Sequence, residues 1–324
     1  MDLQSKHMLP ATDYPDVHIS AATARKLFKF ESSLGQGGFG AIFQARINKD
    51  AKLQVLDSDK GRDVVVKEVA VKVLPNTGTR QRFFNHREIS FQFFCSQAPN
   101  FCHLYATLGV EDEIWMVLEM LAGGTIYDVS KCYAANIEEP CIAYLAREIL
   151  RGLQFLHNHG LVHRDLKNTN IMFTLTGQVK IIDFGLCCDA ALGERTEICG
   201  SAYWIPPEMI RAEPHSFPAD VWSFGVCVLE LANKHPPNYR APRRQMFTVA
   251  TRGMPGGHGL ESPSKWSSEF TTFLQRCFEV DPTRRAPVDA LLDDPFLTVA
   301  CGLEKIEKLL ANAFARRALS SIML

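Results

Sequence analysis

The chain has 324 residues, of which 46% are hydrophobic and 22% are charged, and 35 basic residues nearly balance 36 acidic ones. This composition excludes wholesale disorder, and the formal net charge of −1 excludes both a broadly basic surface for nucleic acid and a polyacidic tail. At about 150 residues per domain, the length corresponds to roughly two domains' worth of chain.

Targeting and redox features point to the cytoplasm. No apolar run approaches the ~18 residues of a membrane span, and the amino terminus lacks the apolar core of a signal peptide. The ten cysteines show no paired C-x-x-C spacing, so a zinc ribbon is not expected. Without a secretory signal they are expected to be reduced, mostly buried thiols.

The first third of the chain has mainly strand-like texture. Residues 1–19 are polar and interrupted by proline, so a tail is expected there. Alternating and β-branched patterns then predict strands, with one helix among them. The expected strands are 28–34, 41–47, 64–74, 105–110 and 114–120, with a hairpin connection at 48–63 and a phenylalanine-rich helix at 81–97.

After Gly123-Gly124 the texture changes to long helical patterns at 139–159, 219–233 and 267–278. The chain therefore divides near residues 121–125 into a small β-rich part and a larger helical part. A cleft between two such parts is the natural place for a ligand. At the carboxyl end, apolar residues at helical spacing within 303–324 predict a helix packed on the larger part.

A glycine-rich motif, Gly35-Gln36-Gly37-Gly38-Phe39-Gly40, matches G-x-G-x-x-G. Alone, it could be a dinucleotide fingerprint or an ordinary hairpin turn. In a dinucleotide site the glycines open a helix, whereas residues 41–45 continue here as a strand. A glycine loop between two strands favours a flap that lies over phosphates.

Two lysines compete for the role of phosphate ligand. Lys67 and Lys72 are five residues apart, so a regular strand would place them on opposite faces. We choose Lys72, because it ends a V-A-V-K motif and Ala70 on the same face leaves room for a purine. Glu88, sixteen residues later, is the expected ion-pair partner, although a solvated helical glutamate is the alternative.

The most specific motif is His163-Arg164-Asp165-Leu166-Lys167-Asn168-Thr169-Asn170, which matches H-R-D-x-x-x-x-N. Asp165 would accept or orient the proton of an attacking hydroxyl, Lys167 would offset phosphoryl charge, and Asn170 would hold a metal ion. Asp183, in the D-F-G triplet that follows an apolar strand, would bind Mg²⁺.

Further structural positions lie downstream of these motifs. The segment from Gly200 to Glu208 stands where an A-P-E segment is expected, and Asp220 opens the run D-V-W-S-F-G. Glu208 and Arg285 are predicted to form a buried ion pair that braces the substrate loop.

Together these residues resemble the eukaryotic protein kinases over residues 28–296, and Lys167 is typical of the serine/threonine type. Within that family, four segments are most similar to the PAK kinases of the sterile-20 group: 121–125, 183–187, 200–208 and 273–277. The resemblance implies an α+β, bilobal fold with a small antiparallel N-lobe sheet, one key helix and a larger, mainly helical C-lobe. The implied layout is a tail at 1–19, a kinase domain at 20–300 (N-lobe 20–120, hinge 119–124, C-lobe 125–300) and a helix at 301–324.

The implied activity is transfer of the γ-phosphoryl group of ATP, with Mg²⁺, to serine or threonine hydroxyls of protein substrates in signalling. A Rac-type GTPase pathway acting through regions outside this chain is the implied partner, with no nucleic acid. The implied adenine site has Leu118 as gatekeeper, backbone pairing at Glu119 and Leu121, and apolar walls at Leu34, Ile42, Ala70, Leu118, Met172 and Ile182. The alternatives are a nucleotide-binding pseudokinase scaffold and, more remotely, a nicotinamide-dependent oxidoreductase.

The chain departs from the family pattern in its activation loop, whose notable residues are Thr196, Glu197 and Ser201. Glu197 stands where the sterile-20 group usually has a phosphorylatable threonine, and Arg164 is the phosphate-binding residue in such kinases. Either Glu197 partly substitutes for the phosphate, or the loop shifts and Thr196 is the phosphosite.

At two further positions, Gln92 and Cys199, the sequence leaves two interpretations open. Gln92 stands four residues after Glu88, where kinases have an apolar residue. Phe93 would replace it if the helix register slips by one, and otherwise the helix would be loosely positioned. Cys199 is either an inert cysteine or a thiol open to oxidation.

Overall fold

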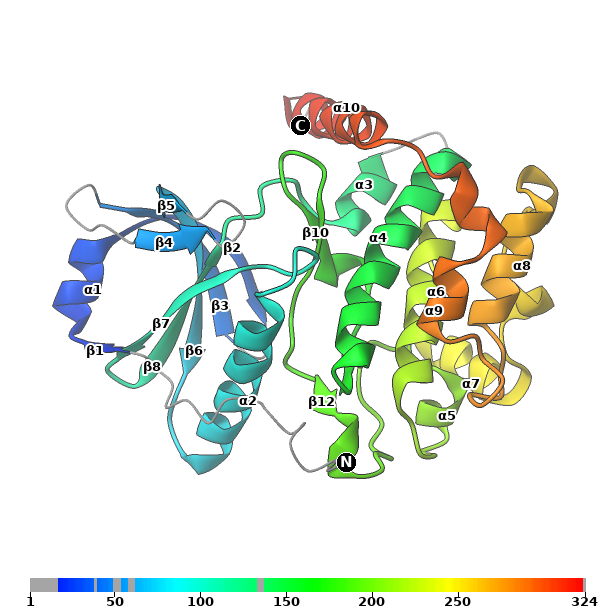
Figure 1. The fold of residues 1–324 in the computed structure, drawn as a ribbon, viewed down its shortest axis with the longest axis horizontal. Coiled ribbons are helices and arrows are strands. Elements are labelled where there is room, and N and C mark those ends of the chain that lie inside the picture. The colour runs from blue at the N-terminus through cyan, green and yellow to red at the C-terminus, as the bar shows by residue number, and fades with distance from the viewer. Residues whose placement is uncertain (1–16, 38–39, 49–53, 58–61, 133–136, 323–324) are drawn as a thin grey trace. The chain divides into compact units, whose positions relative to one another are not determined.

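The computed structural model describes residues 17–37, 40–48, 54–57, 62–132 and 137–322, which fall into two units (Figure 1). The units are Met1–Leu121 and Ala122–Leu324. The first is built on a β-sheet and the second is mainly helical, so the predicted α+β fold class is confirmed.

The first unit contains a six-stranded sheet in the order β1-β7-β8-β6-β3-β2. The short strand β1 pairs parallel with β7, and the other neighbours are antiparallel. A separate hairpin pairs β4 with β5. The strands are β1 (Val17–Ile19), β2 (Phe28–Gly37), β3 (Gly40–Ile47), β4 (Gln54–Asp57), β5 (Arg62–Val65), β6 (Glu68–Pro75), β7 (Leu104–Val110) and β8 (Glu113–Glu119).

The two faces of this sheet have different roles. On one face Val69, Val71 and Val117 are fully buried and pack with Ala24 of helix α1 (Ala21–Leu27). Because side chains alternate along a strand, Ala70 and Lys72 of β6 lie on the opposite face. That face therefore carries the residues predicted to bind nucleotide, and the core lies behind it.

Several expectations for this unit need correction. The tail predicted to reach residue 19 is wrong at its end, because Val17–Ile19 pair with β7; residues 1–16 lie outside the described part. Helix α1 was not predicted, since its seven residues are too few for a helical pattern to stand out. The single strand predicted at 64–74 is two strands, β5 and β6.

Helices dominate the second unit, and α6 is its central element, with every residue from 219 to 232 buried. Helix α4 packs against α6 and has its own buried stripe, as the 139–159 pattern predicted. The helices are α3 (Ile126–Cys132), α4 (Glu139–Asn158), α5 (Pro207–Ile210), α6 (Phe217–Asn233), α7 (Pro242–Arg252), α8 (Ser268–Cys277), α9 (Val288–Leu292) and α10 (Leu303–Ile322). None of the helices in the described residues is long and apolar enough to cross a membrane.

Two small antiparallel sheets carry the loops of the second unit. Strand β9 (Leu161–Val162) pairs with β12 (Cys188–Asp189), and β10 (Ile171–Phe173) pairs with β11 (Val179–Ile181). Short 3-10 turns complete the unit at η2 (Asn168–Asn170), η3 (Ala190–Leu192), η4 (Pro255–Gly257), η5 (Pro263–Lys265) and η6 (Pro295–Val299).

The carboxyl-terminal run is helical, and α10 contacts α3 (Figure 1). Ile306 and Leu310 are buried, whereas Leu303 and Phe314 remain 38% and 39% exposed. The buried face also includes Leu309, so the stripe is rotated slightly from the one expected from spacing alone.

A buried acid without a partner stands out in the core of this unit. Glu230 of α6 is 1% exposed, and neither carboxylate oxygen has a hydrogen-bond partner among the described residues. Burial raises the pKa of this carboxyl to about 7, against a smaller lowering effect of Lys131. Below about pH 7, Glu230 therefore favours its protonated form in the folded protein.

We predict that Glu230→Gln stabilises the protein at alkaline pH. A carboxyl whose pKa rises on folding holds its proton more tightly in the folded state, so stability falls as pH rises from the unfolded value toward about 7. Neutral glutamine escapes this loss, which amounts to at most about 3 kcal/mol. Thermal unfolding at pH 8 should show the stabilisation, and it should vanish near pH 4.5. Glu304→Gln, at a side chain that is 79% exposed, is the control; equal pH profiles for both variants would contradict the prediction.

Candidate active site

In the first unit, Lys72 Nζ donates a hydrogen bond to Glu88 Oε1 of helix α2 (Thr79–Cys95). Both residues are buried, at 8% and 5% exposure, so water screens this ion pair little. Lys67 precedes β6 and is exposed. Of the two candidate lysines, the structure thus joins Lys72 to the glutamate expected from the spacing, and it leaves Lys67 at the surface.

Helix α2 is fixed one turn further on by a polar contact. Gln92 is 4% exposed, and its Nε2 donates to the backbone oxygen of Cys102 over 2.6 Å. Phe93 is 40% exposed, so the idea that a slipped register lets Phe93 replace Gln92 is wrong. The hydrogen bond, rather than an apolar contact, attaches this side of the helix to the segment before β7.

Part of the predicted adenine wall comes together on the sheet. Ala70 lies opposite Leu118 of β8, and Ile42 lies opposite Lys72, so these side chains share one face. Ala70 and Leu118 are 8% and 9% exposed, whereas Leu34 is 48% exposed. Glu119 ends β8, and Leu121 is buried two residues beyond it. Met172 and Ile182, predicted for the same wall, are half-buried in the second unit.

The glycine motif joins β2 to β3. Gly37 pairs with Gly40, with Gln36 and Gly35 opposite Ala41 and Ile42; Gly38 and Phe39 lie outside the described residues. Gly40 has a φ of 138°, and a Cβ there would lie 2.2 Å from the backbone oxygen of Val73. Only glycine therefore fits this position.

Asp165 is the centre of a polar cluster in the second unit. Its Oδ1 accepts a hydrogen bond from Ser201 Oγ over 2.8 Å, and its Oδ2 accepts one from Lys167 Nζ over 2.8 Å. Lys167 Nζ also donates to Ser201 Oγ over 3.1 Å. The sequence placed Ser201 in the activation loop, but its contact with Asp165 spans 36 residues and had no local signal.

The two predicted metal ligands meet at one end of a hairpin. Asn170 precedes β10 and Asp183 follows β11 by two residues, and Ile182 N donates to Asn170 O over 3.0 Å. The amide nitrogen of Asn170 donates a hydrogen bond to Asp165 O over 2.9 Å. The amide oxygen of Asn170 is therefore the candidate ligand atom.

This pair of residues fits Mg²⁺ rather than a fully protein-enclosed ion. No group of three acidic, histidine or cysteine side chains suited to a metal occurs among the described residues. One carboxylate and one amide oxygen match the few protein ligands that Mg²⁺ takes when phosphates and water complete its shell.

A buried carboxylate holds the loop that carries Asp165. Asp220 is fully buried and accepts hydrogen bonds from the backbone N–H groups of His163 and Arg164 over 2.8 and 2.9 Å, and from His157 Nε2 over 3.0 Å. Burial alone would raise the pKa of Asp220, but these hydrogen bonds and the nearby histidines lower it. The bonds also hold Arg164 at a φ of 65°, which a non-glycine residue rarely adopts.

The histidine of this loop has a defined tautomer. His163 Nδ1 accepts from the N–H of Asp165 over 3.3 Å, so Nε2 carries the proton and donates to Ile182 O over 3.2 Å. Its ring also lies 5.6 Å from that of Phe184. His163 therefore links the loop of Asp165 to the segment of Asp183.

Glu197 pairs with the arginine expected to bind phosphate. Arg164 donates to Glu197 Oε1 over 2.8 Å, and its side chain is 5% exposed. The hydrogen bond from Arg164 lowers the pKa of Glu197 to about 2, so the carboxylate is charged at neutral pH. Thr196 is exposed, and its N–H donates to Glu197 Oε2 over 3.1 Å. The contact made by Glu197 is the one that the phosphate-substitution hypothesis requires.

The cysteines near this segment are poorly suited to oxidation. Burial raises the pKa of Cys199, which makes the reactive thiolate scarce, and Cys187 and Cys188 are buried. This favours the inert alternative for Cys199.

A second ion pair braces the segment that follows. Arg285 donates to both carboxylate oxygens of Glu208 over 2.7 and 2.9 Å, and both side chains are almost fully buried. The guanidinium of Arg285 also lies 5.1 Å from the ring centre of Trp222. The predicted pair is thus present, and removing one partner would leave a buried charge.

Comparison with known proteins agrees with this geometry. Residues 28–297 match the protein kinase domain family. The chain belongs to the protein kinase family. Members of this family generally use ATP and Mg²⁺.

The relatives found by sequence comparison indicate which protein kinases this chain resembles most within the family. The chain is 39% identical over 290 residues to the probable serine/threonine-protein kinase mkcC of Dictyostelium discoideum, 33% over 271 residues to serine/threonine-protein kinase STE20 of Candida glabrata, and 30% over 298 residues to serine/threonine-protein kinase PAK 1 of Mus musculus. These alignments cover 90%, 82% and 91% of this chain but only 30%, 27% and 51% of the relatives. The resemblance to sterile-20 and PAK kinases is therefore confirmed, and the chain spans about half or less of the length of these relatives.

We predict that Glu197→Gln lowers catalytic activity roughly tenfold, because a neutral amide loses the charge-assisted bond to Arg164. A lowered pKa places loss of the ion pair at acid pH, between the ordinary value of 4.5 and about 2. Wild-type rates should therefore show no change due to Glu197 between about pH 5 and 9. Initial rates on a basic protein substrate test this, with Glu194→Gln, at an exposed residue three positions earlier, as control. A Glu197→Gln variant as active as wild type would contradict the assigned role.

Proposed function

We propose that this chain is the catalytic domain of a protein serine/threonine kinase that transfers the γ-phosphoryl group of ATP to hydroxyls of protein substrates in signalling. The observation that carries the proposal is the cluster around Asp165, in which a carboxylate, an ammonium and a hydroxyl lie within hydrogen-bond distance of one another. Such a cluster suits in-line phosphoryl transfer, which depends on positioning and charge compensation.

In the proposed reaction, Asp165 orients the substrate hydroxyl and receives its proton as the oxygen bonds to the γ-phosphorus. The bond from that phosphorus to the β,γ-bridging oxygen breaks, and ADP leaves. Lys167 offsets charge on the transferred group. Ser201 Oγ already donates to Asp165 Oδ1, so a substrate hydroxyl would meet the same acceptor atom.

Other residues would hold the nucleotide. Lys72, oriented by Glu88, would neutralise charge on the α- and β-phosphates. Asn170 and Asp183 would hold Mg²⁺, which neutralises phosphate charge when bound. The adenine would contact the apolar face around Ala70 and Leu118 and pair with backbone groups of Glu119 and Leu121.

The ion pair between Arg164 and Glu197 bears on how the kinase is regulated. We infer that Glu197 substitutes in part for a phosphothreonine, with one charge where a phosphate carries nearly two. We also propose, from the resemblance to the PAK kinases, a Rac-type GTPase pathway that acts through regions outside this chain. The buried free thiols favour a reducing, cytoplasmic setting.

A pseudokinase scaffold has no support, since every predicted catalytic position is filled.

We predict that Asp165→Asn lowers kcat by about 10²–10⁴-fold while the KM for ATP changes little, because asparagine keeps the shape but cannot take the proton. Steady-state kinetics on a basic protein substrate, with direct nucleotide binding measured in parallel, test the assignment. Lys72→Met is the contrasting variant and should weaken ATP binding. Loss of nucleotide binding as the main defect of Asp165→Asn would contradict the role given to Asp165.

The two hypotheses about the activation loop, phosphate substitution by Glu197 and phosphorylation of Thr196, make different predictions. If Glu197 substitutes for phosphate, phosphatase treatment should leave wild-type activity unchanged, and Thr196→Ala should match wild type. If phosphatase abolishes wild-type activity and leaves the Thr196→Ala variant unaffected, Thr196 is the phosphosite and the inference about Glu197 is wrong.

A further inference from the structure

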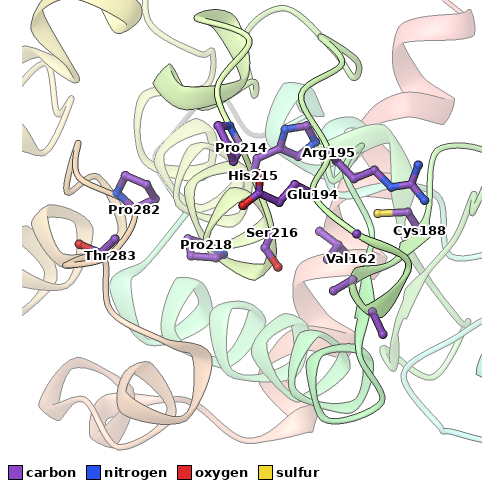
Figure 2. Close-up of a pocket in the computed structure, with 13 residues that line it drawn as sticks. Val162, Cys188, Glu194, Arg195, Pro214, His215, Ser216, Pro218, Pro282 and Thr283 are labelled. Carbon is purple, nitrogen blue, oxygen red and sulfur yellow. The ribbon is translucent and has the colours of Figure 1, made fainter. Parts of the chain in front are cut away.

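The second unit has a cavity of about 480 Å³ whose wall includes segments 193–195, 214–218 and 282–283 (Figure 2). Two polar atoms there, Arg195 Nε and His215 Nε2, lack a partner among the described residues, but they are buried and do not face the open volume. The remaining lining is mainly apolar and selects no particular ligand. The exposed face of helix α7 carries a more specific pattern (Figure 1).

Helix α7 lies within a stretch of the chain that has no acidic residues. Residues 231–260 contain no aspartate or glutamate, but they contain Lys234 and four arginines, at positions 240, 243, 244 and 252. Acidic residues make up 36 of the 324 residues, so a stretch of this length would ordinarily hold about three of them. The positive charge of this stretch therefore contrasts with the net charge of −1 of the whole chain.

Two of these arginines share the outer face of α7 with a phenylalanine. Gln245 and Val249 are buried and mark the inner face of the helix. Because a helix turns by about 100° per residue, Arg243, Arg244 and Phe247 lie on the opposite side, and all three are exposed. Phe247 is 67% exposed, more than any other aromatic side chain among the described residues. We call these three residues the α7 surface.

The two arginines of the α7 surface are available to a partner. Neither the Arg243 nor the Arg244 side chain has an ion-pair or hydrogen-bond partner among the described residues. The acid tied to this helix is already engaged: Glu213 accepts two hydrogen bonds from Arg211, over 2.8 and 2.7 Å, and Arg211 also donates to Ala250 O of α7. An acidic side chain from another molecule would therefore meet two uncompensated guanidinium groups.

Helix α7 is attached to the segment that follows Ser201. The hydroxyl of Tyr203 donates to the backbone oxygen of Tyr239, three residues before α7 begins. Ser201 lies two positions before Tyr203, and its Oγ donates to Asp165 Oδ1 over 2.8 Å. A protein bound to α7 would therefore contact the same unit as Asp165, next to a helix that is linked to the segment at the candidate active site.

The chemistry of the α7 surface indicates what it would bind. Guanidinium groups pair with carboxylates through two parallel hydrogen bonds, and arginines and aromatic rings are enriched among the residues that dominate protein interfaces. A nucleic acid would need a broader basic surface than these few arginines provide. An acidic protein segment with one apolar side chain matches both the cations and the exposed ring.

We propose that the α7 surface docks an acidic segment of the protein substrate. Carboxylates of that segment pair with Arg243 and Arg244, and an aliphatic side chain between them covers the ring of Phe247. The identification of the docked protein as a substrate rests on the proposed phosphoryl transfer, whereas the docking itself does not. Binding and catalysis are therefore measured separately.

The binding experiment follows fluorescence anisotropy of labelled peptides mixed with the full chain. The acidic peptide has a central leucine flanked on both sides by aspartates and glutamates, and the neutral peptide has asparagines and glutamines in their place. The acidic peptide should bind with a Kd of about 10–100 µM at about 0.05 M salt, and the neutral peptide at least about tenfold more weakly. Salt at about 0.5 M should weaken the acidic peptide at least about fivefold, because water and ions screen exposed charges.

Variants at exposed positions locate the docking surface. The double variant Arg243→Gln, Arg244→Gln should weaken binding of the acidic peptide at least about tenfold. The matched control Arg25→Gln, Lys26→Gln removes two exposed cations from α1 and should change the Kd by less than about twofold. Phe247→Ser should weaken the leucine peptide about threefold and leave a serine-centred peptide unchanged, because only leucine loses a contact.

The kinetic experiment joins the acidic peptide through a flexible linker to a peptide that the wild-type chain phosphorylates. Docking should lower the KM of the joined peptide at least about fivefold with kcat unchanged, because the bound segment raises the local concentration of its phosphoacceptor. The double variant at Arg243 and Arg244 should lose this gain, and it should phosphorylate the unjoined peptide as wild type does.

Contrary results are distinct for docking and for catalysis. Equal binding of the acidic and neutral peptides, or equal binding by the two double variants, would overturn the docking surface. Tighter binding of anionic phospholipid vesicles or of a single-stranded oligonucleotide, lost in the Arg243 and Arg244 variant, would assign the surface to another polyanion. Peptide binding without the gain in KM would show that the docked protein is not a substrate. Binding by a chain that phosphorylates no peptide would contradict the proposed function instead.

Discussion

The buried carboxylate of Asp220 is the constraint on which the site in the second unit depends. It lies on α6, whose residues 219–232 are all buried, and it holds the N–H groups of His163 and Arg164. A positive φ at Arg164 costs of order 1–3 kcal/mol, and it persists because the surrounding hydrogen bonds determine it. Asp165 follows directly, so its carboxylate is positioned by a loop tied to the most buried helix of the unit.

Arg164 extends this constraint along the chain. Its Nε donates to Leu186 O over 2.8 Å, while its guanidinium also holds Glu197. His163 makes a parallel link to Ile182. The segments that follow β11 are therefore attached to the same loop at several points. A carboxylate at position 197 supplies the last link without any covalent modification, although with less charge than a phosphate would bring.

Buried charged side chains of the second unit follow two patterns. Some are satisfied by an ion-pair partner, and another has no hydrogen-bond partner among the described residues. Glu208 and Arg285 form a bidentate pair that satisfies both partners, as a buried charge requires. Glu230 lies as deep and has no hydrogen-bond partner among the described residues, so below about pH 7 it favours the protonated form instead. Arg195 Nε and His215 Nε2 are likewise buried and have no hydrogen-bond partner among the described residues.

The sequence by itself determined the main strands and long helices, the choice of Lys72 over Lys67, and the loop of Asp165, because periodicity and motif spacing are local properties. It missed β1 and α1, which are too short for a pattern to stand out. Only the tertiary structure decided that Gln92 is anchored by a hydrogen bond and that Ser201 and Glu197 reach Asp165 and Arg164. These contacts, like the pairing of Arg195 with His215, join residues 10 to 36 positions apart or bring separate loops together, and packing rather than local preference sets which atoms meet.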